Sequence, residues 1–135
     1  MTGQNLSRID ISPGEDPTTI ILDKNNISKI ENLEKCQGLR QLSLAGNRLV
    51  RMSGVNRLRN LTVLNLPNNS IVAIEGLKDL TELAWLNLSG NSIKTLLLHG
   101  NIITSLKPVP HNFPKSLVIL SLAENEIIDI NEVSN

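Results

Sequence analysis

The sequence contains few residues of the kinds that support catalysis, metal binding or disulfide formation. Its 135 residues include one cysteine, Cys36, two histidines and no tyrosine, and the formal net charge at pH 7 is zero. A single cysteine excludes an internal disulfide framework and a cysteine-rich metal site. A net charge of zero argues against a general nucleic-acid-binding protein, because such proteins depend on neutralising phosphates.

Long apolar runs are also absent, and no stretch of 18 or more apolar residues is present to span a membrane. Residues 1–16 are polar and lack the apolar segment of a secretory signal. Hydrophobic residues nevertheless make up 40% of the chain, which excludes a disordered protein. We therefore expect one folded domain in the cytosol or the nucleus.

The apolar residues that are present have nearly the same size. The chain contains 23 leucines and 15 isoleucines, whereas Trp85 and Phe113 are its only aromatic residues. Asparagine is also abundant, with 17 occurrences. A core built from side chains of one size indicates one packing arrangement used repeatedly, which is typical of a repeat protein.

The asparagines reveal the period. Four of them recur at a constant spacing of twenty-two positions within the same frame, L-x-x-L-x-L-x-x-N-x-I-x-x-I-x-x-L-x-x-L, which is the pattern of a leucine-rich repeat. The L-x-L step predicts a short strand, and the later steps of three residues suit 3₁₀ turns. The asparagine side chain can bond backbone groups left free by the turn. We expect a structural asparagine ladder of Asn25, Asn47, Asn69, Asn91, Asn101 and Asn125.

The period fails between Asn91 and Asn101, where the spacing falls to ten positions, and the next spacing, from Asn101 to Asn125, is 24. Because a parallel crossover needs about a dozen residues or more, the two strand cores on either side lie too close for an ordinary coil. A missing stretch of twelve positions, or of twelve plus a multiple of the period, would restore the frame, so we interpret the short spacing as a deletion. The alternative is a natural short hairpin. We interpret residues 1–16 as a degenerate cap or half-repeat. Residues 17–135 form the repeat domain, with a truncated repeat at 83–92, as a piece of a longer protein.

The 22-residue frame resembles the phosphatase-regulator class of leucine-rich repeats. The residues between the leucines are similar to those of a family of centrosomal leucine-rich-repeat proteins that also carry an IQ motif, in segments 21–25, 31–36, 47–52, 63–67, 94–106 and 120–127. The pattern and the resemblance predict the α/β class, as a right-handed solenoid. Its short parallel strands lie on the concave side, and 3₁₀ or irregular turns lie on the convex side.

The resemblance implies a non-catalytic scaffold of the cytoplasm and cytoskeleton, located at the centrosome and centriole. It would act with a centriole-capping coiled-coil protein to restrain cilium assembly. In that family a further full repeat separates the equivalents of Lys94 and Thr95. The family's IQ motif binds calmodulin, but no such segment occurs in this chain, so calmodulin is not expected to bind through it.

Two other functions fit the same repeats. One is a regulatory subunit of a protein phosphatase, and the other is a protein-binding domain of the splicing machinery. Catalysis is not expected, because His99 and His111 have no carboxylate, serine or cysteine at motif spacing. We predict no catalytic, metal or cofactor site, no nucleic-acid or membrane partner, and a buried, unreactive role for Cys36.

The outward positions of the predicted strands form two files. One file contains Thr19, Gln41, Val63, Trp85, Thr95 and Ile119, and the other contains Ile21, Ser43, Asn65, Asn87, Leu97 and Ser121. An exposed tryptophan beside apolar neighbours favours a partner interface, and the alternative is that Trp85 covers the disrupted junction. No acidic residue lies between Glu34 and Glu75, so the arginines there form either a solvated face or a dock for an acidic partner. The candidate partner-binding residues are Val63, Asn65, Trp85, Asn87, Arg48 and Arg51.

Overall fold

The computed structural model describes residues 1–93, 95–97, 119–121 and 129–131. The strands in it are short because each repeat supplies one inward-facing residue between two outward-facing ones. Within the described residues there are seven strands of three residues each, namely β1 (Thr19–Ile21), β2 (Gln41–Ser43), β3 (Val63–Asn65), β4 (Trp85–Asn87), β5 (Thr95–Leu97), β6 (Ile119–Ser121) and β7 (Asp129–Asn131).

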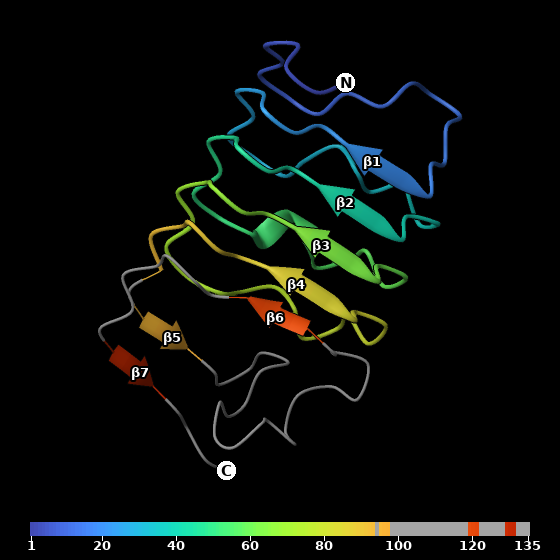
Figure 1. Cartoon of the computed structure of the whole chain (residues 1–135). Helices are drawn as coiled ribbons and strands as arrows, with labels where there is room; N and C mark the ends of the chain where they lie inside the picture. The colour runs from blue at the N-terminus through green and yellow to red at the C-terminus, as the bar shows by residue number, and fades with distance from the viewer. Residues whose placement is uncertain (94, 98–118, 122–128, 132–135) are drawn as a thin grey trace.

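The main sheet is parallel and has the order β1-β2-β3-β4-β6, so that the strands follow one another like the steps of a ladder (Figure 1). The central residues of β1 to β4 share one register, in which Leu64 stands beside Leu42 on one side and Leu86 on the other. One turn of chain therefore adds one strand. This arrangement confirms the predicted leucine-rich-repeat solenoid.

The connections opposite the sheet are 3₁₀-like, as the three-residue steps predict. In the second coil the N–H groups of Val55, Leu58 and Leu61 each donate to the carbonyl oxygen three residues earlier, over 3.0–3.2 Å. The 3₁₀ helix η1 (Ser53–Val55) is the one helix among the described residues. Because 3₁₀ turns place every third side chain on the same side, the leucines of these steps all face the interior.

The core is one continuous cluster that runs through all the coils from Ile9 to Ile93. Most of its side chains are fully buried, whereas a single coil on its own would leave one apolar edge uncovered. Stability in such a protein is a sum of contacts between neighbouring coils. No helix among the described residues is long and apolar enough to cross a membrane.

The sheet departs from sequence order at the junction. The strand that pairs with β4 is β6, not β5, and β5 pairs instead with β7 in a separate two-stranded sheet. Only seven residues separate the end of β4 from the start of β5, which is too short for a parallel crossover. The prediction that Thr95 and Leu97 continue the two outward files is therefore wrong, whereas Ile119 and Ser121 occupy the expected register beside Trp85 and Asn87.

Candidate partner-binding surface

The outward face of the main sheet carries Trp85, the single tryptophan. The side chain is 38% exposed, and Val63 stands beside it in register on β3 with intermediate burial. The backbone of Trp85 is held by its N–H, which donates to the carbonyl oxygen of Thr62 over 3.1 Å. A large amphipathic ring is thus presented on a fixed backbone, which is the usual character of an interface anchor.

The second outward file is polar and is bonded across coils. Ser43 Oγ donates to Asp23 Oδ1 over 2.6 Å, and Asn65 Nδ2 donates to Ser43 Oγ over 3.0 Å. In the next coil, Asn87 Oδ1 accepts from both the backbone N–H and the hydroxyl of Ser89. These bonds fix the side chains that border the tryptophan.

Within the described part of this face, one buried polar atom has no partner. Asn65 Oδ1 accepts no hydrogen bond, although the Nδ2 of the same amide is bonded to Ser43. Sequence reasoning placed Asn65 and Ser43 in the outward file but missed Asp23, which organises the network. The available signal was that Asp23 is the one ionisable residue at a repeat position otherwise occupied by Ala45, Pro67 and Ser89.

The asparagines at the repeat turns are buried and fully bonded. Asn47 Oδ1 accepts from the N–H of Ile27 in the preceding coil, and its Nδ2 donates to the carbonyl oxygens of Leu22 and Leu44. The same arrangement recurs one repeat later at Asn69. Each amide therefore joins two successive coils. Asn25 and Asn91 are bonded in similar ways, and Asn101 and Asn125 lie outside the described residues.

Replacing Asn69 by leucine is expected to reduce the free energy of unfolding by about 1–3 kcal/mol. The side-chain volume is nearly kept, but the buried N–H of Leu49 loses its acceptor and the carbonyl of Leu44 loses a donor. Urea denaturation followed by circular dichroism measures the change. Asn56→Leu is the control, because Asn56 is exposed. Equal stability of the two variants would contradict a bonding role for Asn69.

The two arginines of the predicted site do not join the tryptophan. Arg48 and Arg51 follow β2 on the way to η1, and both are exposed. Arg51 forms a two-point ion pair with Glu75, with Nε–Oε1 at 2.9 Å and Nη2–Oε2 at 3.0 Å. Exposed ion pairs of this kind contribute little to stability. This pair nevertheless engages the guanidinium of Arg51, which the sequence analysis had offered as a contact for an acidic partner.

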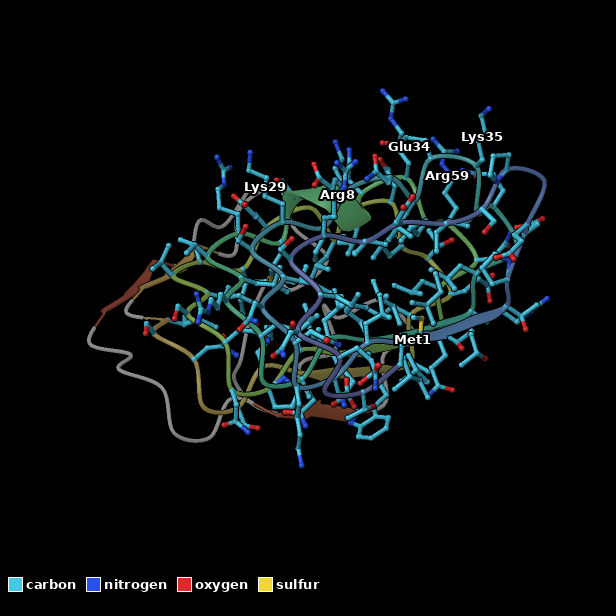
Figure 2. All side chains as sticks on the ribbon, turned by 90° about the horizontal axis from the view of Figure 1, so that it is seen from above. Met1, Arg8, Lys29, Glu34, Lys35 and Arg59 are labelled. Atoms are coloured by element: carbon cyan, nitrogen blue, oxygen red, sulfur yellow. The ribbon has the colours of Figure 1, made fainter. Side chains whose placement is uncertain are left out.

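Other basic side chains of this region lie on the far side of the solenoid. Viewed along the stack, Lys29, Lys35 and Arg59 project from the side away from β1, in the company of Glu34 (Figure 2). The candidate residues themselves fall into two groups, one on the strands around Trp85 and one, Arg48 and Arg51, in the connection between β2 and η1. We name the first group the Trp85 patch; it consists of Val63, Asn65, Trp85 and Asn87.

The single cysteine lies in the interior, and His99 and His111 lie outside the described residues. Cys36 is buried, and this burial, together with the negative charges of Asp16, Glu34 and Glu15, raises the pKa of its thiol. A raised pKa leaves less of the nucleophilic thiolate at neutral pH. Among the described residues no group of three or more His, Cys, Asp or Glu side chains is arranged to hold a metal ion.

Comparison with known proteins decides the family. A model of leucine-rich repeats matches residues 39–93, and the mouse centrosomal protein of 97 kDa is 54% identical over 169 residues that cover 98% of this chain. The chain belongs to the leucine-rich-repeat family. The human centrosomal protein of 97 kDa is 69% identical over 36 residues, 27% of the chain and 4% of the human protein. These names agree with the predicted centrosomal location.

Solved leucine-rich-repeat proteins share the fold at low identity. An internalin of Listeria monocytogenes superposes with a TM-score of 0.61 and 19% identity over 87% of this chain and 35% of its own. The Toll protein in its complex with Spätzle, from Drosophila, gives a TM-score of 0.69 and 20% identity over 89% of this chain and 17% of its own. At these identities the likeness establishes the architecture of the repeat chain.

The mouse match also concerns the length of the repeat chain. The chain spans 20% of the mouse protein, so that most of the homologue lies outside the comparison. The match covers 98% of the 135 residues of this chain, which is about 132 residues, but extends over 169 positions, so about 37 of those positions have no counterpart here. This surplus is close to the thirty-four positions, one full repeat of twenty-two plus twelve, that would restore the frame.

Proposed function

We propose that this chain is a non-catalytic scaffold of the centrosome that binds a partner polypeptide through the Trp85 patch. The observation that carries the proposal is the exposed tryptophan beside Val63, fixed on a parallel ladder and bordered by hydrogen-bonded side chains. A rigid aromatic anchor of this kind contributes much of the binding energy in protein interfaces, because little conformational entropy is lost on docking.

The partner that we propose is a centriole-capping coiled-coil protein, and the consequence of binding is restraint of cilium assembly. The support is the family resemblance together with the homology to the mouse and human centrosomal proteins. A coiled coil offers a row of aliphatic and polar side chains along one helix face, which suits an extended surface built from repeated strands.

Replacing Trp85 by alanine is expected to weaken partner binding by about 2 kcal/mol, or roughly 30-fold in Kd, while the fold remains intact. Most of the loss arises because a desolvated aromatic contact disappears. Isothermal titration with the purified partner measures it, and circular dichroism verifies folding. Ile21→Ala is the matched control, since Ile21 is exposed on the same face at the opposite end of the sheet.

Unchanged affinity in a folded Trp85→Ala variant would move the site to the arginines between Arg48 and Arg59, and Arg48→Glu would then slow association most at low salt. A quantified pull-down with the full chain separates the alternatives. Enrichment of a phosphatase catalytic subunit or of splicing proteins, in place of a centriolar coiled-coil protein, would contradict the proposed partner.

A further inference from the structure

The second residue after each of β1 to β4 occupies the same place in its coil. These four residues are Asp23, Ala45, Pro67 and Ser89. The carbonyl oxygen of each one accepts a backbone N–H from the preceding coil, over 2.7–3.0 Å. The four positions therefore share one backbone arrangement, and they differ in the side chain and in whether an N–H group is present.

This difference decides how the neighbouring side chains are bonded. In the fourth coil, Asn87 Oδ1 accepts from the N–H of Ser89 over 3.0 Å and from its hydroxyl over 2.7 Å. Asn65 stands beside Asn87 in register, one coil earlier. The residue that would supply its donor is Pro67, which has no N–H. Asn65 Oδ1 is accordingly left buried and without a donor among the described residues.

The amide of Asn65 cannot turn round to remove the defect. Ser43 Oγ lies 2.6 Å from Asp23 Oδ1, and because a carboxylate only accepts, the hydroxyl donates its single hydrogen there. Its oxygen then faces Asn65 as an acceptor, which the Nδ2 end of the amide satisfies over 3.0 Å. Turning the amide would place two acceptors against each other. Buried polar groups nearly always have a partner, so the open acceptor calls for a donor that the described residues do not provide.

We propose that Asn65 is a specificity determinant of the Trp85 patch and accepts a hydrogen bond from a lysine or arginine side chain of the partner. This inference rests on the proposed function, because it assigns the chemistry of the partner at the same patch. Asn65 and Val63 are both half-buried, so this part of β3 belongs to the surface onto which the partner docks.

Two observations select a cationic donor. Asn65 is joined through Ser43 to the carboxylate of Asp23, and a chain of hydrogen bonds polarises its last oxygen toward a positive donor. The ring of Trp85, exposed on the adjacent strand, attracts the same kind of group through its negative face. The partner is therefore expected to place a basic residue beside the aliphatic side chain that contacts Trp85.

The variant Pro67→Ser tests the proposal. It supplies the N–H and the hydroxyl that Ser89 gives to Asn87, so that Asn65 Oδ1 is satisfied within the chain. Binding of the purified coiled-coil partner, measured by isothermal titration, should weaken about ten-fold, which corresponds to the loss of one charge-assisted hydrogen bond. Circular dichroism and urea denaturation verify folding, and serine already occupies this position in the fourth coil.

Ala45→Ser is the matched control. The N–H of Ala45 already donates to Asp23 Oδ1 over 2.9 Å, and the added hydroxyl lies one coil away from Pro67, so the affinity should stay at the wild-type value. Pro67→Ala supplies the N–H alone and should give a smaller loss than Pro67→Ser. Because the donor is a cation, the affinity of the wild-type chain should fall more steeply with salt than that of Pro67→Ser.

Three results would overturn the inference. Wild-type affinity in folded Pro67→Ser, while Trp85→Ala still weakens binding, would show that Asn65 is served by a buried water only, and it would leave the proposed function intact. A ten-fold loss with unchanged salt dependence would identify a neutral donor in place of lysine or arginine. Unchanged affinity in Trp85→Ala would remove the patch itself, and the inference with it.

Discussion

Replacing Leu66 by alanine is expected to lower the free energy of unfolding by about 2–5 kcal/mol. Leu66 is fully buried, and it stands between Leu44 and Leu88, which hold the same repeat position in the adjacent coils and are also fully buried. The loss combines the transfer free energy of the removed atoms with the cavity that remains. The close-packed coils cannot collapse to fill this cavity, because their backbones are hydrogen-bonded to one another.

Urea denaturation of the purified chain measures this loss, with Val72→Ala as the control because Val72 is 49% exposed. Removal of the Leu66 side chain should also affect the packing of Leu44 and Leu88 in the two neighbouring coils. A double variant with Leu44→Ala should therefore deviate from additivity, since the two cavities adjoin. Costs near zero for alanine at Leu44, Leu66 and Leu88 alike would contradict the repeat register.

Inserting thirty-four residues with repeat spacing between Lys94 and Thr95 is expected to convert the chain into one cooperative solenoid. β1 to β4 begin at a constant spacing of twenty-two positions, whereas β5 begins only ten positions after β4. With the insertion, β5 would begin two full repeats after β4. We propose that such a segment is what the homologue possesses and this chain lacks, consistent with the surplus of about 37 matched positions.

Without the insertion, the amides of β5 and β7 should exchange faster than those of β2 and β3. The reason is that a two-stranded sheet is marginal on its own, whereas β2 and β3 are paired on both edges. With the insertion, exchange should become uniform and denaturation should show one transition. A flexible insert of the same length, made of glycine and serine, is the control. If the repeat insert behaves like the flexible one, the missing-segment interpretation fails.

Much of the fold was predictable because one local environment recurs in every coil. The position of an apolar residue within the 22-residue frame determines whether it faces the interior, so Leu42, Leu64 and Leu86 could be assigned from spacing alone. The exposure of Trp85 follows from the same alternation. The asparagine positions were equally predictable, since each one occupies the same turn.

The candidate site was predictable only in part. The outward file around Trp85 follows from strand alternation, but the bonds that join Asp23, Ser43 and Asn65 depend on side-chain rotamers in three successive coils. The pairing of Arg51 with Glu75 likewise connects residues 24 positions apart. No repeat consensus specifies such pairs, because they involve the variable positions between the leucines.

The sequence by itself determined the period, the inward and outward faces and the buried asparagines, because these depend on spacing within a single coil and its nearest neighbours. Only the tertiary structure decided which strand follows β4 and how Asp23, Ser43 and Asn65 bond across three coils. At the junction the connecting chain is too short for β5 to reach the sheet, so the register passes to β6.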